Sequence, residues 1–191
     1  MAGKTPREAV DNYISYLEET LSIITEDRLV VFPPSQKQFR AAYFPTPATV
    51  RLNNRTNLYI SVVQLLATQP LPDGNHKVRT RFYSYILLEE PEVARHGVVS
   101  YHWHPHDSAV RFPHLHIKIT GQLGYPDLEQ KINRAHYPTS RVCLEDFVLL
   151  LIRYYDVKPR IPKDKWTRLL EKNKKAFDKW ATWKIQHPSG I

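Results

Sequence analysis

The spacing of apolar residues changes twice along the chain, and this change is the strongest constraint on its fold. Near the N-terminus apolar residues recur every three or four positions, which is typical of one face of a helix. Residues 5–8 read Thr-Pro-Arg-Glu. This predicts that Thr5 caps the helix, that Glu8 reaches back to Thr5, and that Pro6 occupies the first helical position. The apolar stripe consists of Val10, Tyr13, Ile14, Leu17, Leu21 and Ile24.

The middle of the chain has a different pattern, because it is rich in Val, Ile, Tyr and Phe and is divided by turn signals. Such segments predict short antiparallel strands. The apolar residues of 58–67 also permit a buried helix. From residue 139 the helical spacing returns, and we expect helices at 141–155 and 163–185. The expected strands are 28–32, 39–44, 49–52, 57–67, 77–88, 98–104 and 114–120.

Together these segments predict an α+β fold, in which an antiparallel β-sheet is packed by an N-terminal helix and two C-terminal helices. A chain of 191 residues suffices for one core, so we expect a single domain. Its parts would be an N-terminal helix (1–26), a sheet core (27–121) and a basic helical part (139–191).

The single cysteine, Cys143, excludes an internal disulfide and favours a cytoplasmic protein. No apolar run approaches the roughly 20 residues that span a bilayer, so we expect no membrane contact.

Residues 101–116 read YHWHPHDSAVRFPHLH and contain five of the nine histidines. Side chains alternate along a strand, so His102 and His104 share one face of the first strand, and His114 and His116 share one face of the second. The loop 107–113 suits a hairpin, which would bring the two pairs together on the face opposite the apolar residues. If Phe82 and Ile86 of an upstream strand face the core, four more residues join the histidines: Arg79, Arg81, Tyr83 and Tyr85.

Three interpretations of this histidine face compete. In the first, the protein is an enzyme that cleaves RNA without a cofactor. A neutral imidazole removes the proton of a ribose 2′-hydroxyl and a protonated imidazole donates to the leaving oxygen. We expect His104 and His116 to be this pair, in either order. The supporting groups around them and the phosphate would be His114, His102, Arg111, Arg81 and Tyr85.

In the second interpretation the histidines hold a catalytic metal ion such as zinc or iron, since residue type and spacing suffice for a metal site. In the third, the chain is a non-enzymatic module that binds nucleic acid or a partner, and the histidines fill a half-polar surface. The candidate metal ligands are His102, His104, His106, His114 and His116.

The positive charge of the chain is concentrated near its C-terminus. Residues 158–184 hold ten basic and three acidic residues, which is +7 of the net charge of +8. Such a segment favours a polyanion or an acidic partner, although a solvated lysine-rich helix face gives the same pattern. The six glycines form neither a P-loop nor a dinucleotide-binding fingerprint. The expected nucleic-acid-binding residues are Arg79, Lys118, Lys165, Arg168, Lys172 and Lys175.

An aromatic strand with alternating Tyr and His, a polar loop and the sequence FPHLH at 112–116 together resemble the TumE-like bacterial toxins. The likeness covers residues 57–120. It implies an RNA-cleaving toxin neutralised by a cognate antitoxin protein that binds DNA. The positions that carry over are His114, His116 and the upstream His104 and His106. Two features depart from the family: the second histidine follows the first by only two residues, and helices at both ends lengthen the chain.

Overall fold

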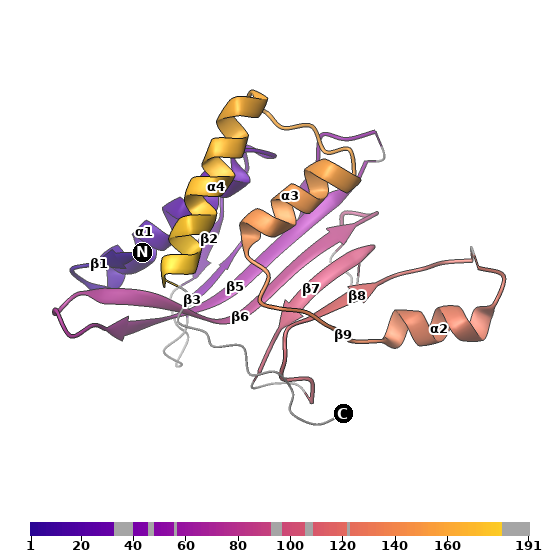
Figure 1. Cartoon of the computed structure of the whole chain (residues 1–191), viewed down its shortest axis with the longest axis horizontal. Helices are drawn as coiled ribbons and strands as arrows, with labels where there is room; N and C mark the ends of the chain where they lie inside the picture. The colour runs from indigo at the N-terminus through magenta and orange to yellow at the C-terminus, as the bar shows by residue number, and fades with distance from the viewer. Residues whose placement is uncertain are drawn as a thin grey trace.

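The structure is a computed structural model that describes residues 1–32, 40–45, 48–55, 57–92, 97–105, 109–121 and 123–180. An antiparallel sheet with helices packed against it confirms the expected α+β fold (Figure 1). The elements in chain order are β1 (Ala2–Gly3), α1 (Pro6–Leu21), β2 (Val30–Phe32), β3 (Arg40–Tyr43), β4 (Val50–Arg51), β5 (Tyr59–Pro70), β6 (His76–Leu88), β7 (Val99–Trp103), β8 (His114–Ile117), α2 (Pro126–Arg134), β9 (Tyr137–Pro138), α3 (Leu144–Tyr154) and α4 (Lys163–Trp180).

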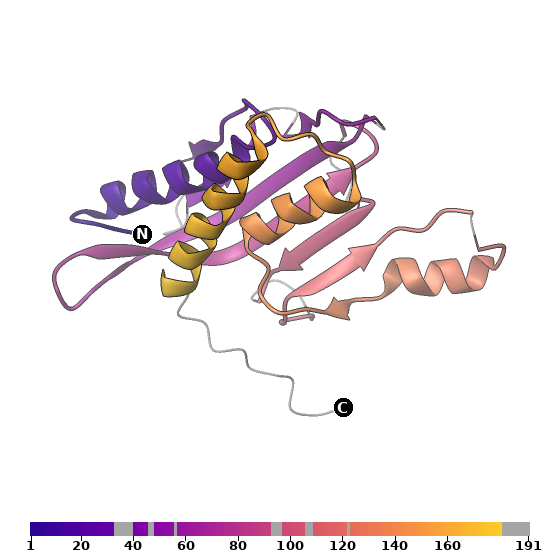
Figure 2. The same ribbon diagram turned by 45° about the horizontal axis from the view of Figure 1, so that its top comes forward.

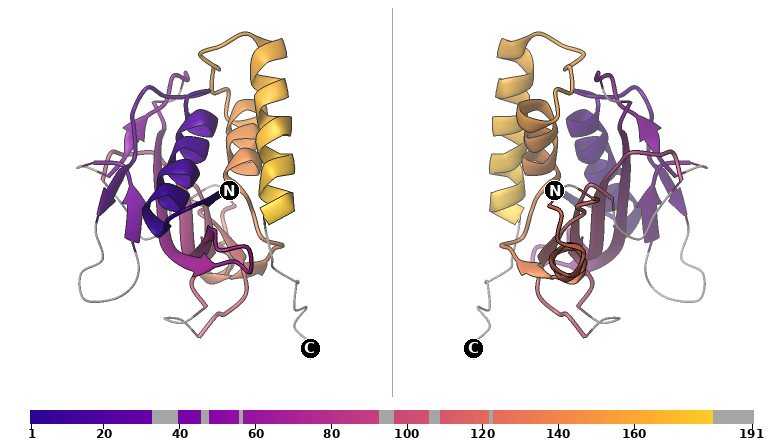
Figure 3. Two further views of the ribbon diagram at one scale, coloured as in Figure 1. Left: turned by 90° about the vertical axis from the view of Figure 1, so that its left-hand side faces the viewer. Right: turned by 90° about the vertical axis from the view of Figure 1, so that its right-hand side faces the viewer.

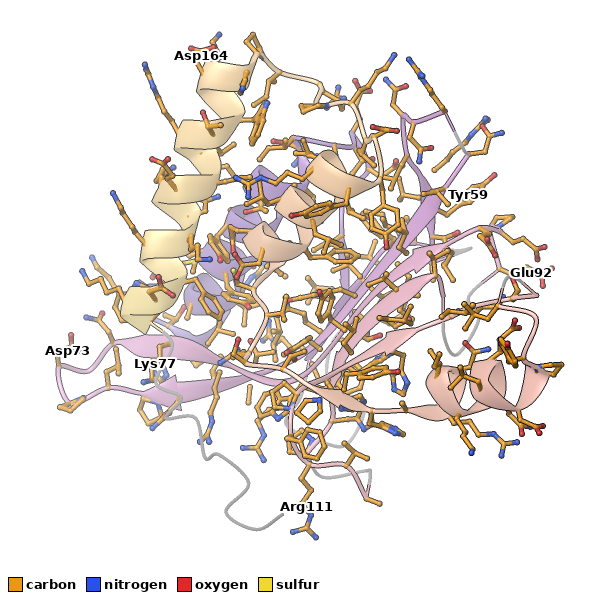
Figure 4. The ribbon with its side chains drawn as sticks, turned by 45° about the vertical axis from the view of Figure 1, so that its right-hand side comes forward. Tyr59, Asp73, Lys77, Glu92, Arg111 and Asp164 are labelled. Atoms are coloured by element: carbon orange, nitrogen blue, oxygen red, sulfur yellow. The ribbon has the colours of Figure 1, made fainter. Side chains whose placement is uncertain are left out.

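The sheet is largely the expected meander, with the strand order β2-β3-β5-β6-β7-β8-β9. Strand β4 pairs with β5, and β1 pairs with β6. Residues 59–67 of the segment that also permitted a helix lie in the strand β5, whose backbone pairs with β3 and β6 on its two sides. A tight turn closes the long β5–β6 hairpin, in which Gly74 has a φ of +81° and Asp73 accepts a hydrogen bond from the Asn75 backbone (Figure 4).

Helix α1 begins as its sequence predicts. The Thr5 hydroxyl accepts a hydrogen bond from the backbone N–H of Glu8 at 3.1 Å, and Pro6 is the first helical residue. The Glu8 carboxylate accepts from the backbone N–H of Lys4 at 2.8 Å, one residue before the expected Thr5. The apolar stripe faces the core: Val10 and Leu17 are each 1% exposed. Burial of this stripe holds the helix against β5 and β6.

Helices α3 and α4 pack beside α1 on the same face of the sheet (Figures 1 and 3). A buried polar chain joins the three helices. The Thr20 hydroxyl of α1 donates to the Glu145 carboxylate of α3 at 2.8 Å, and the Asn173 amide of α4 donates to the Thr20 hydroxyl at 3.1 Å. Helix α4 is described to Trp180, so the expected extension to residue 185 lies outside the described residues. None of the described helices is long and apolar enough to cross a membrane.

The expected orientation of β6 is wrong. Tyr83 and Tyr85 are 1% and 3% exposed and belong to the core under the helices. Leu65 pairs with Phe82 and Leu66 with Thr80, so Arg81 is the extra residue of a β-bulge. Residues 83–88 are all buried, so both faces of this part of β6 are covered. Alternation of apolar and polar residues therefore cannot show which face lies under the helices.

Helix α2 and strand β9 are absent from the expected elements. Helix α2 lies beyond the β8–β9 edge of the sheet (Figure 2). None of its residues is buried, so it has no apolar stripe that packs on a core. Strand β9 has only two residues, which is too short to show alternation.

Candidate histidine site

Two neighbouring strands place four histidines on one face of the sheet, as the sequence predicts. His102 of β7 lies opposite His114 of β8, and Ser100 lies opposite His116. The alternate residues Tyr101, Trp103 and Leu115 pack against the core under the helices. The histidines therefore occupy the sheet face turned away from α1, α3 and α4.

A fifth histidine, which the sequence pattern did not predict, lies on this face. Strand β9 pairs with β8 through Pro138 opposite His114 and Tyr137 opposite Leu115. His136 immediately precedes β9 and continues this register beside His116. Its ring centroid lies 4.4 Å from that of His116 and 4.9 Å from that of His114. Only its residue type could have pointed to it, because it lies 20 residues beyond His116 in a segment without a strand pattern.

His114, His116 and His136 form the tightest group. One ring nitrogen from each of these residues lies within 4.8 Å of the corresponding nitrogens of the other two. His114 and His116 are 0% and 3% exposed, whereas His136 is exposed. Nitrogens bound to a tetrahedral zinc ion at ~2.0–2.1 Å lie about 3.3 Å apart. The three nitrogens are therefore farther apart than in a closed zinc site, and side chains would have to move to close around an ion; His136 is the exposed one of the three.

The backbone fixes which nitrogen of His114 is available. Its Nδ1 lies 2.9 Å from the carbonyl oxygen of Phe112. Because a carbonyl oxygen only accepts, Nδ1 carries the proton and Nε2 presents its lone pair. Metal-binding histidines are commonly oriented by such a second hydrogen bond. The arrangement therefore leaves His114 in the tautomer that coordinates a metal through Nε2.

His102 and His104 extend the group toward the β7–β8 hairpin. The His102 ring lies 5.5 Å from that of His116 and 5.9 Å from that of His114. The His104 ring lies 5.1 Å from that of His114 and is half-buried. Five imidazoles thus share one surface. The remaining candidate ligand, His106, lies outside the described residues.

One of the groups expected around the phosphate lies away from the histidines. Tyr85 is on the opposite face, where its hydroxyl accepts a hydrogen bond from the Gln64 amide at 2.8 Å, so its assignment to the site is wrong. Arg81 is half-buried at the β-bulge. Arg111 is exposed and extends away from the sheet (Figure 4). Lys118 is exposed and lies 3.9 Å from the Glu89 carboxylate.

The basic residues expected to bind nucleic acid lie mostly on the other side of the sheet. Arg79 lines a cleft beside α1 and α4. Lys172 also forms an ion pair with Glu19 of α1 at 2.8 Å. These cations are therefore not part of the histidine site. Four of them are exposed on α4: Lys165, Arg168, Lys172 and Lys175.

No protein-family model, curated protein or solved structure matches the chain. The resemblance to TumE-like toxins therefore stays a prediction from the sequence.

Proposed function

We propose that His114, His116 and His136 bind a transition metal ion of the zinc class and that this centre cleaves phosphodiester bonds of RNA. The observation that carries the proposal is the convergence of three ring nitrogens within 4.8 Å, from β8 and the residue before β9. The carbonyl of Phe112 supports it, because it holds His114 in the metal-binding tautomer. Three protein ligands leave a coordination position for water, and a bound zinc ion makes that water a nucleophile near neutral pH.

RNA is proposed as the substrate because of the charge of the chain. The net charge is +8, which raises the local concentration of polyanions. The exposed Arg111 lies in the connection between β7 and β8 and precedes Phe112, whose carbonyl orients His114. It is therefore the candidate phosphate contact nearest in sequence to the metal ligands.

Metal-independent cleavage by acid–base catalysis is the second candidate. It is favoured by His104, which is half-buried and lies 5.1 Å from the fully buried His114. The His114 ring in turn lies 5.0 Å from that of His116. His104 and His116 are the base and acid of this mechanism, and the rings of both therefore lie beside the ring of His114. A phosphodiester would have to reach both of them without a metal ion.

One experiment separates the two candidates. Metal content is measured in protein purified without a histidine tag, as wild type, His136→Ala and His76→Ala. His76 lies at the start of β6 and serves as the matched control. We expect about one metal ion per chain in the wild type and in His76→Ala, and a loss of metal in His136→Ala. RNA cleavage should stop when a chelator removes the metal.

Three results would contradict the metal centre. The first is wild-type protein that is free of metal, and the second is metal content that His136→Ala leaves unchanged. The third is cleavage that continues at the full rate in chelator, which would favour acid–base catalysis if it is lost in His116→Ala. A protein that binds metal but cleaves no RNA would contradict the proposed substrate and leave the metal site standing.

A further inference from the structure

A cleft opens on the helix side of the sheet, between α1, β6 and the end of α4. It has about 420 Å³ of unfilled space, open solvent included. It lies across the sheet from the histidines and has no part in the metal site. The lining residues that matter here are Tyr13, Arg79, Thr80, Arg141, Phe177 and Trp180.

Cations and aromatic rings meet in this cleft. The Arg141 guanidinium lies 5.1 Å from the centre of the Phe177 ring. Lys179, which does not line the cleft, has its ammonium 5.7 Å from the centre of the Trp180 ring. Arg79 is exposed beside them. None of the described residues that line the cleft is acidic. A positive surface with flat aromatic groups matches a ligand that joins a phosphate to a planar base.

The floor of the cleft is polar but internally satisfied. The Tyr13 hydroxyl lies 2.8 Å from the Gln64 side-chain oxygen, to which it donates, and 3.1 Å from the Thr80 hydroxyl. These groups hold α1 against β5 and β6 and need no ligand. Recognition therefore depends on the rim, where Arg79, Arg141 and Trp180 lie.

We propose that this cleft binds one nucleotide of a single-stranded RNA, with the phosphate on Arg79 and Arg141 and the base against Trp180. The inference rests on the proposed function, because it names where the RNA that is cleaved at the histidines is held. Arg141 follows His136 by five residues, so the backbone between them spans at most about 17 Å. That distance corresponds to about five stacked nucleotides at ~3.4 Å each. In this proposal, one RNA strand passes around the β9 edge and contacts both sites.

The test is the binding of a fluorescently labelled oligouridine, followed by fluorescence anisotropy at several salt concentrations. The variants are Arg79→Ala and Trp180→Ala, and the matched control is Lys165→Ala, which removes one exposed positive charge from α4. We expect each cleft variant to weaken binding at least about fivefold and the control less than about twofold. Arg79→Ala should also reduce the slope of log K against log salt by about one, whereas Trp180→Ala should leave the slope unchanged.

Unchanged affinity in both cleft variants would overturn the inference. Equal losses in all three variants would also overturn it, because binding would then not depend specifically on the cleft. The same preparations are analysed for metal, and circular dichroism checks their fold. RNA binding that depends on Arg79 and Trp180 in a chain without metal would contradict the proposed metal centre and leave this inference standing. Metal binding without any RNA binding would contradict this inference and leave the proposed metal centre standing.

Discussion

The surroundings of single residues decide which side chains in this protein are chemically available. His114 is fully buried, its Nδ1 lies against the Phe112 carbonyl, and its ring centre lies 5.0 Å from that of His116. Cys143 is also buried, at 2% exposed, but its neighbours are carboxylates. The two buried residues therefore differ in their surroundings: His114 lies among other imidazoles, whereas the Cys143 thiol lies beside carboxylates.

Cys143 should be unreactive in the folded protein. Burial raises the pKa of the Cys143 thiol well above its usual range, and the carboxylates of Glu145 and Asp146 raise this pKa further. The thiol donates a hydrogen bond to the Asp146 carboxylate at 3.1 Å. Because the thiolate is the nucleophile, we expect iodoacetamide to leave the native protein unmodified at neutral pH. Mass spectrometry measures the modified fraction over time.

The denatured protein is the control for this reaction. Unfolding in urea removes the burial, so the thiol should then react at the rate of a free cysteine. Native protein that reacts as fast as denatured protein would show that the Cys143 thiol is accessible and ionised. That result would contradict the packing of α3 against the sheet.

At the scale of elements, helix α1 depends on a cap that the sequence already shows. Thr5→Ala removes the acceptor for the Glu8 backbone N–H and should lower the free energy of unfolding by about 1 kcal/mol. Thr167→Ala is the control, because this threonine donates to the Lys163 carbonyl within α4 and caps nothing. Its replacement should be neutral or slightly stabilising. Urea unfolding followed by circular dichroism measures both changes, and equal losses would contradict a specific role for the cap.

The sheet shows which parts of the site a sequence can predict. The faces of His102, His104, His114 and His116 follow from alternation, because Tyr101, Trp103 and Leu115 between them are apolar and face the core. Alternation failed at Tyr85, where both faces of β6 are buried and a bulge at Arg81 shifts the register. It is also silent for His136, since a long-range pairing of only two residues brings this histidine to the site.

At the scale of the whole molecule, the two faces of the sheet have different roles. The face under α1, α3 and α4 carries the apolar core and the buried Asn173–Thr20–Glu145 chain. The opposite face carries the five imidazoles. Strand β9 is paired with β8 through the backbone. A metal ion held by His114, His116 and His136 would add a second link between these strands, through side chains. Metal binding should therefore be coupled to the stability of the fold.

Zinc should stabilise the folded protein through these three histidines. A ligand that binds only the folded state at 100 times its Kd adds about 2.7 kcal/mol to the free energy of unfolding. We expect zinc to raise the urea midpoint of the wild type and of His76→Ala. It should not raise the midpoint of His136→Ala, whose stability without metal should be close to that of the wild type because His136 is exposed.

Magnesium separates a histidine site from general binding of divalent cations. It prefers oxygen ligands and near-ideal octahedral geometry, so it should leave the urea midpoint of every variant unchanged. Equal stabilisation by zinc in the wild type and in His136→Ala would place the ion elsewhere on the chain. A wild-type midpoint unaffected by zinc would show that the imidazoles of β8 and His136 do not close around a metal. The acid–base mechanism at His104 and His116 would then be the stronger candidate.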